Sequence, residues 1–185
     1  MIFRSKRVFL FFLFLFSFTS EVHSQRLEAI KARWNDSFKE WDVYTDEGEG
    51  TLTLRWQVRS DWTAWDFRVG ERSGTIDMRF RDNPEYWELR CGSEKVYLRT
   101  QWPRDITSWT IETDHGRLIW KSYWRDNLDE WIVDTKADPN PFSMYTEFIG
   151  DQRDWIINDQ NDGSIPFPAR LAMAFITVFQ AMPKF

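Results

Sequence analysis

Trp65-Asp66-Phe67-Arg68-Val69 is the stretch of sequence that decides the fold. Apolar and charged side chains alternate along it with a period of two, which is the pattern of a β-strand with one buried face and one exposed face. A similar stretch begins at each of six tryptophans, which lie 24, 22, 22, 22 and 24 residues apart: Trp41, Trp65, Trp87, Trp109, Trp131 and Trp155. A fixed period of this length indicates a fold built from repeated units.

A second aromatic residue follows each of the first five tryptophans by 15 or 17 residues: Trp56, Phe80, Trp102, Trp124 and Phe148. Turn-forming residues such as His115-Gly116 separate the two aromatics of a repeat, and polar turns such as Arg81-Asp82-Asn83-Pro84 separate successive repeats. Each repeat is therefore predicted to be a β-hairpin. The six hairpins are expected near residues 38–58, 62–81, 85–103, 107–125, 129–149 and 153–167. The fold class is all-β, an antiparallel meander of about twelve strands.

A register follows if each opening tryptophan is paired with the closing aromatic of its repeat. It places Asp42 opposite Arg55 within a hairpin, and Arg55 beside Asp66 between hairpins. It also places all eleven aromatics in one row on an apolar face, with charges of alternating sign on the other face. The one like-charge contact, Arg90 against Arg99, predicts a slip or bulge in the third hairpin.

So wide an apolar face must be covered, and the C-terminal residues 168–182 provide the cover. Pro168 suits the start of a helix, Pro183 suits its end, and apolar residues occur all round it, as in a buried helix. A sheet of about twelve strands must curl or close. Because the register contains no stagger, we expect an incompletely closed barrel, with the helix inside; full closure requires at least two slipped turns. Residues 25–33 are expected to form a short amphipathic helix that caps one end.

The first 24 residues are predicted to be a secretory signal peptide, with basic residues Arg4, Lys6 and Arg7 before an apolar run from Val8 to Phe18. Residues 25–185 then form one repeat-built β domain. Residues 1–24 hold three of the 24 basic and one of the 29 acidic side chains, so the remainder has 21 basic, 28 acidic and a net charge of −7. This charge argues against nucleic acid or an anionic membrane as a partner held by charge.

The sequence contains no arrangement that predicts catalysis, and we expect no enzyme activity, no cofactor and no metal site. After removal of the signal, His115 is the one histidine and is placed in a hairpin turn. Cys91 is placed on the apolar face, so a Cys-His pair is not expected. There is no spacing typical of a zinc, calcium or phosphate site.

Trp62 and Tyr86 are out of phase with the aromatic row and lie in turns between repeats, which makes them the candidate binding residues, although they could instead cover the core at its edge. We expect an exported protein of the periplasm, cell surface or medium: a non-enzymatic envelope protein with a structural or binding role, whose partner is an apolar ligand, a glycan or an envelope protein. Two alternatives stay open. One is a small outer-membrane β-barrel with the aromatic face toward lipid and the charges inside. The other is a glycan-binding or adhesin module.

Overall fold

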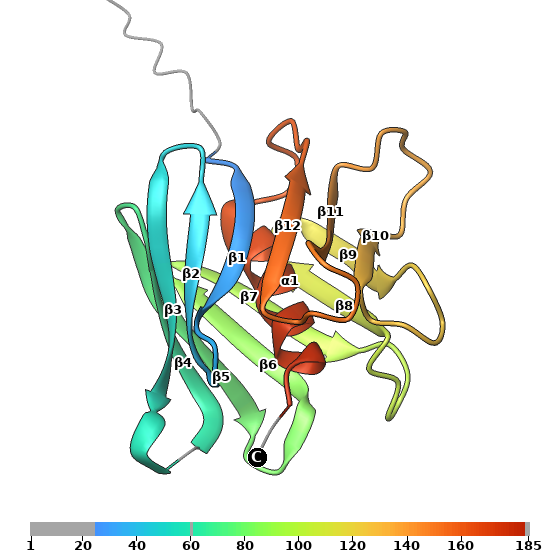
Figure 1. Ribbon diagram of the computed structural model, residues 1–185. Helices are drawn as coiled ribbons and strands as arrows, with labels where there is room; N and C mark the ends of the chain where they lie inside the picture. The colour runs from blue at the N-terminus through green and yellow to red at the C-terminus, as the bar shows by residue number, and fades with distance from the viewer. Residues whose placement is uncertain (1–24, 60, 184–185) are drawn as a thin grey trace, which may run out of the picture.

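A computed structural model describes residues 25–59 and 61–183, which form a closed barrel of twelve antiparallel strands around one helix (Figure 1). The strands are β1 (Leu27–Trp34), β2 (Ser37–Thr45), β3 (Gly48–Trp56), β4 (Asp61–Val69), β5 (Arg72–Phe80), β6 (Asn83–Cys91), β7 (Glu94–Thr100), β8 (Ser108–Thr113), β9 (Gly116–Ser122), β10 (Glu130–Val133), β11 (Phe142–Thr146) and β12 (Asp154–Asp159). The helix is α1 (Phe167–Ala181), and a 3-10 turn spans Gln57–Arg59. The predicted all-β class and the internal helix are confirmed. The predicted signal peptide lies outside the described residues.

The predicted N-terminal helix is wrong, because residues 27–34 form strand β1. Leu27 and Ile30 both point inward, and their spacing of three residues suggested a helix. A β-bulge between Leu27 and Ala29 produces that spacing within a strand. The predicted hairpin at 153–167 is also wrong, because residues 154–159 form the single strand β12, which pairs with β1 from the other end of the chain and closes the barrel. Pairing of these two edge strands leaves no open edge.

The predicted register is wrong by an even number of residues at every pairing. Within a hairpin, Trp41 pairs with Leu52, four residues before the closing aromatic Trp56. Between hairpins, Trp65 pairs with Leu54, two residues before Trp56. The other opening tryptophans pair with the same offsets of four and two residues before the closing aromatic. The two pairings of β1, with β12 and with β2, follow the same rule. Because a shift by two residues keeps each side chain on its face, the predicted inner and outer faces survive.

The two offsets leave a net displacement of two residues per hairpin, which is the stagger that closure requires. Starting at Trp41, the paired residues run to Leu52 and then to Phe67, two residues beyond Trp65. A stagger of about one residue per strand tilts the strands by about 35–45° in a closed barrel. Equivalent residues of the six hairpins then lie at the same level along the barrel axis, as the inner layers of other barrels do. The opening tryptophans therefore form one inner ring.

The outer face carries ion pairs that run diagonally across neighbouring strands. Three pairs predicted between hairpins are present: Arg55–Asp66 at 2.7 Å, Arg99–Glu112 at 3.4 Å and Lys121–Asp134 at 2.8 Å. A diagonal offset of two residues is within reach of such long side chains. The pairs predicted within hairpins, such as Asp42–Arg55, are wrong, since Asp42 lies opposite Thr51. Arg90 lies opposite Lys95 and not Arg99, so the predicted local slip is part of the general stagger.

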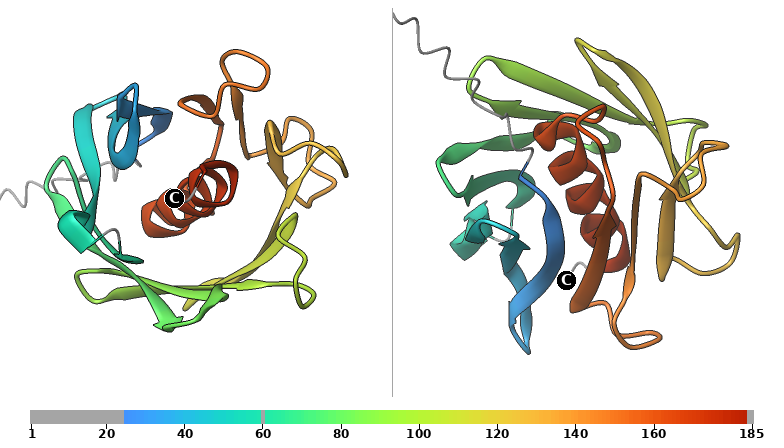
Figure 2. Two further views of the ribbon diagram at one scale, coloured as in Figure 1. Left: turned by 60° about the horizontal axis from the view of Figure 1, so that its bottom comes forward. Right: turned by 90° about the horizontal axis from the view of Figure 1, so that it is seen from above.

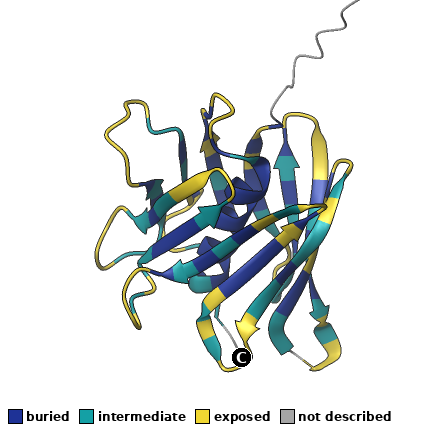
Figure 3. Ribbon diagram, turned by 180° about the vertical axis from the view of Figure 1, so that it is seen from behind, coloured by how far each residue is buried: buried dark blue, intermediate teal, exposed yellow. Residues whose placement is uncertain are grey.

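Helix α1 runs through the barrel and fills it (Figure 2, left). Every residue of the helix except Gln180 is buried, as the dark blue ribbon in Figure 3 shows. Phe175 and Phe179 pack edge-on against Trp87, with ring centroids 5.1 and 4.6 Å away. Inside the wall, Trp120 donates its indole N–H to the Thr177 hydroxyl at 2.9 Å. Eight strands enclose room for side chains alone, so twelve strands provide the wider interior that a helix of about 10–12 Å needs.

A buried ion pair fixes the helix to the seam of the barrel. Arg170 of α1 contacts Asp159 at the end of β12, and the two side chains are 0% and 1% exposed. The same Asp159 oxygen accepts a hydrogen bond from the backbone N–H of Leu27 in β1 at 3.0 Å. Burial away from water lowers the pKa of Arg170, and the Asp159 charge opposes this shift. One carboxylate thus joins both seam strands to the helix.

We predict that Asp159→Asn destabilises the protein by about 3–5 kcal/mol, because it removes the carboxylate that forms the buried ion pair with the Arg170 guanidinium. Urea unfolding followed by circular dichroism measures this change in the free energy of unfolding. Asp134→Asn is the matched control, since it breaks an ion pair of partly exposed side chains and should cost less than about 1 kcal/mol. Equal losses for the two variants would contradict the role of the buried pair.

Candidate functional site: the aromatic rim

Each opening tryptophan is held by the turn that precedes it. Its indole N–H donates to the backbone carbonyl three residues earlier, at 2.8–3.2 Å in all six repeats. One residue before that carbonyl, a side-chain oxygen accepts a backbone N–H at 2.6–3.3 Å. The residues that supply this oxygen are Ser37, Asp61, Asn83, Asp105, Asn127 and Asp151. The sequence signature is therefore Ser, Asp or Asn four residues before each tryptophan, and it fixes all inter-hairpin turns alike.

The prediction that all eleven aromatics share the core is wrong for the closing ones. The opening tryptophans are 0–1% exposed, whereas the closing aromatics are 51–65% exposed. The strand pairing is irregular beside Trp34, Trp56 and Phe80, at the ends of β1, β3 and β5, where a step of two residues on each strand lies opposite a step of four on the next strand. The extra residues belong to β2, β4 and β6, before their opening tryptophans, so these three aromatics lie beyond the last regular inward position of their own strands. The other three aromatics follow the ends of β7, β9 and β11.

Trp34 is the sixth member of this set, and it directly follows residues 25–33, which were expected to form a helix. It lies 22 residues before Trp56, and this spacing was the signal that could have identified it. We call the set the aromatic rim: Trp34, Trp56, Phe80, Trp102, Trp124 and Phe148. All six lie at or just beyond the ends of β1, β3, β5, β7, β9 and β11, at the turns between hairpins, and equivalent positions share one level along the barrel axis.

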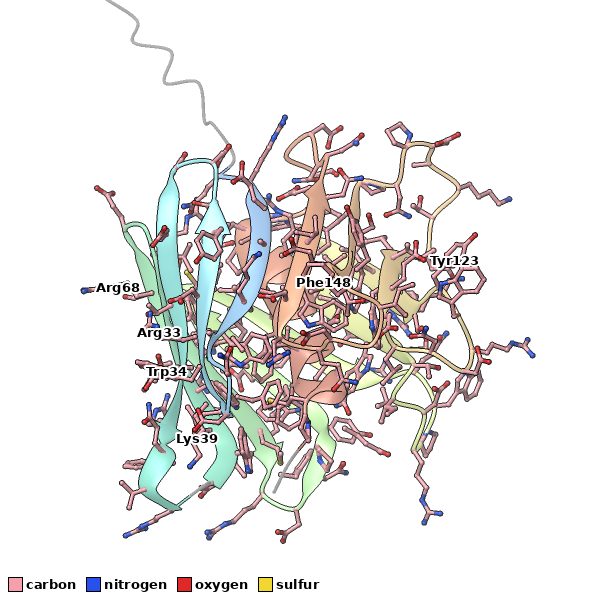
Figure 4. The ribbon with its side chains drawn as sticks, viewed as in Figure 1. Arg33, Trp34, Lys39, Arg68, Tyr123 and Phe148 are labelled. Atoms are coloured by element: carbon pink, nitrogen blue, oxygen red, sulfur yellow. The ribbon has the colours of Figure 1, made fainter. Side chains whose placement is uncertain are left out.

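The rim side chains lie on the outer surface of the barrel. Trp34 donates its indole N–H to Glu40 at 3.4 Å, and Trp124 donates to Glu130 at 2.9 Å. Phe80 contacts Tyr86 edge-on, with ring centroids 5.5 Å apart. Each of these three contact residues directly precedes an opening tryptophan that points inward, so each points outward. Figure 4 labels Trp34 and Phe148 of the rim, together with Tyr123, which packs on Trp124.

A hollow of about 660 Å³ adjoins Trp56. The residues that line it include Val58, Arg55 and Asp66. Arg55 is held in place by ion pairs to Asp66 at 2.7 Å and Asp77 at 3.0 Å. An exposed ring therefore lies beside donors and acceptors whose positions are fixed before any ligand arrives.

The two binding residues predicted from the sequence both lie near the rim. Tyr86 is 36% exposed and contacts Phe80, so it extends the rim on β6. Trp62 is partly buried against Trp65, and its backbone carbonyl accepts the Trp65 indole N–H. Trp62 also lines a hollow of about 120 Å³ with Phe38 and Pro183. The structure thus places Tyr86 on the exposed surface and Trp62 at the edge of the core.

The opposite end of the barrel carries two polar hollows on either side of the loop at 160–166, which connects β12 to α1. One, of about 560 Å³, is lined by Arg117, Asp134 and Ser164 among others, and the second, of about 530 Å³, by Arg72, Glu94 and His115. Acidic and basic side chains are mixed in both hollows. They present no repeated element, in contrast to the rim.

Residues that carry chemistry are dispersed in the described part of the chain. His115 is exposed in the turn between β8 and β9. Cys91 is buried, and burial raises the pKa of its thiol, which favours the unreactive protonated form. No group of three or more His, Cys, Asp or Glu side chains able to hold a metal occurs among residues 25–59 and 61–183. No helix in this part is both long enough and apolar enough to cross a membrane.

In the outer-membrane alternative, the aromatic face points outward and the charges fill the lumen. This orientation of the two faces is wrong. The opening tryptophans and Trp120 are 0–1% exposed and surround α1, and the ion pairs between strands lie on the outer face.

No protein-family model matches the chain, and neither a curated protein nor a solved structure is significantly similar to it.

We predict that the tryptophan fluorescence divides into two populations. Replacing Trp34, Trp56, Trp102 and Trp124 with leucine should remove most of the emission that acrylamide quenches, because these rings are more than half exposed. The remaining emission should shift to the blue, since the opening tryptophans and Trp120 are shielded from water. Near-ultraviolet circular dichroism verifies that the variant is folded. An unchanged quenchable fraction would show that the exposed rings are elsewhere.

Proposed function

We propose that the protein is an exported, non-enzymatic envelope protein whose barrel is a rigid scaffold that presents the aromatic rim to a partner. The observation that carries this proposal is the sixfold repetition of a half-exposed aromatic side chain at one end of the barrel. Folded proteins usually shelter large aromatic rings, and a repeated exposed set is typical of an interaction surface.

The filled interior supports an outer binding surface. Helix α1 occupies the space in which barrels of this size could hold a small ligand, and it is anchored by the Asp159–Arg170 pair. Every buried side-chain nitrogen and oxygen in the described residues has a hydrogen-bond partner. An apolar ligand could enter only if the helix left, which would expose Arg170 and the six indole rings to water. Binding outside requires no such rearrangement.

Export and the absence of catalysis are supported by the sequence. The basic start and apolar run of residues 1–24 have the features of a cleavable signal. Arginines and carboxylates lie beside the aromatic rings of the rim. These carboxylates are held in ion pairs or hydrogen bonds, as Asp66 is by Arg55. An ion-paired carboxylate is ill suited to act as a general acid. The rim is thus suited to binding.

We predict that the native protein is recovered in the envelope fraction of cells, as a chain that begins at Gln25 by intact mass. The variant Trp102→Ala/Phe148→Ala, which removes the two most exposed rings of the rim, should move into the soluble fraction. Tyr44→Ala is the matched control, because Tyr44 is a partly exposed aromatic on β2 near the other end, and it should fractionate as the wild type does. A chain that retains residues 1–24 in the cytoplasm, or a rim variant that stays in the envelope, would overturn the proposal.

A further inference from the structure

The rim combines exposed ring faces with fixed polar groups. The Trp124 indole is held by the Glu130 carboxylate at 2.9 Å, and the Trp34 indole lies beside Glu40, which also pairs with Arg33 at 3.2 Å. At Trp56, the neighbouring polar groups are Arg55 and Asp66. An aromatic face beside carboxylate acceptors and guanidinium donors matches a sugar, whose C–H face stacks on the ring and whose hydroxyls form hydrogen bonds at its edge.

Two other partner classes fit this chemistry less well. A lipid interface accepts tryptophan, but carboxylates such as Glu40 and Glu130 directly beside the rings would be carried into the bilayer boundary, where ionised groups are unfavourable. A protein interface has a core depleted in charged residues. At Trp34, Trp56 and Trp124, by contrast, charged side chains lie directly beside the aromatic ring.

The spacing of the rim adds a second, independent argument. Equivalent residues of adjacent hairpins are two strands apart and displaced by two residues along the strand, which together is about 12 Å. In a β-1,4-linked chain of hexoses, successive rings are turned over, so the same face recurs at every second ring. The length of two such rings is of the same order as the distance between neighbouring rim aromatics. One extended chain could therefore place the same face on two or three rim positions in succession, and the contacts would add through multivalency.

We infer that the rim binds a β-1,4-linked polysaccharide along its outer surface, which rests on the proposed function of the rim as the contact surface. The hollow at Trp56 is the best-formed single position, because Arg55 is already oriented by Asp66 and Asp77. Trp34 and Phe80 lie one hairpin away on either side, on β1 and β5. These three neighbouring positions form the predicted binding track.

The test is depletion of the protein from solution by amorphous cellulose, by chitin and by purified peptidoglycan sacculi, all β-1,4-linked polymers. The chain from Gln25 onward contains every strand of the barrel and the helix, so it is used throughout. We expect depletion by at least one polymer. The double variant Trp34→Ala/Trp56→Ala should bind about tenfold more weakly or worse, which corresponds to the loss of about 1.4 kcal/mol. Tyr44→Ala should bind as the wild type does.

Phosphatidylcholine vesicles are the competing probe, and near-ultraviolet circular dichroism establishes that each variant is folded. Failure of all three polymers to bind, while the rim variant still leaves the envelope fraction in cells, would overturn the glycan inference and leave the proposed function standing. Rim-dependent binding to vesicles alone would identify a lipid surface and also overturn it. Polymer binding that is equal in the wild type and in Trp34→Ala/Trp56→Ala would place the glycan elsewhere on the molecule and refute the binding track.

Discussion

The structure depends on the hydrogen bond that the buried indole N–H of each opening tryptophan must form. A tryptophan ring buries about 150–250 Å², but its N–H requires a partner once water is excluded. For the six opening tryptophans, the partner is the backbone carbonyl three residues earlier, in a turn shaped by Ser, Asp or Asn one residue further back. The indole therefore does more than fill the core. It fixes where each inter-hairpin turn ends and where the following strand begins.

Repetition of this turn six times sets the register of the entire sheet. Each hairpin advances by two residues relative to the last, and the accumulated stagger lets β12 meet β1 with the same offsets as every other pair. Closure of twelve strands creates an interior wider than strand side chains alone can fill. Helix α1 occupies it, and Asp159 ties the helix to both strands of the seam. Strand register, barrel closure and the buried helix are thus consequences of one repeated interaction.

The aromatic rim follows from the same geometry. The opening tryptophans and the helix occupy the interior at this end, so the closing aromatics have no space inside the wall. They lie outside it instead, at or just beyond the ends of their strands, against residues such as Glu40 and Tyr86. Six similar rings at one level of a rigid wall form a surface whose spacing is set by the strands. A rigid presentation of this kind reduces the ordering cost of binding an extended partner.

Apart from β1 and the closing aromatics, the sequence by itself determined which side of the barrel wall the strand residues face. The alternation with a period of two correctly placed Val43, Leu54, Leu89 and Cys91 in the core. The apolar composition of residues 168–182 correctly placed a helix inside the barrel. These inferences hold because they depend on local alternation and composition. The prediction of Tyr86 as a surface residue also drew on this alternation.

Only the tertiary structure decided the register, the closure and the exposure of the closing aromatics. A slip by two or four residues leaves every side chain on its face, so the pattern of Trp41, Leu52 and Trp56 is compatible with several registers. Trp34 and Trp56 continue the alternation of their own strands, yet both rings are more than half exposed because they lie where the regular pairing ends. Whether residues 27–34 form a helix or a strand depends on the free edge of β12, more than 100 residues away. Closure is a condition on all twelve strands together, and for that reason no local stretch of sequence could specify it.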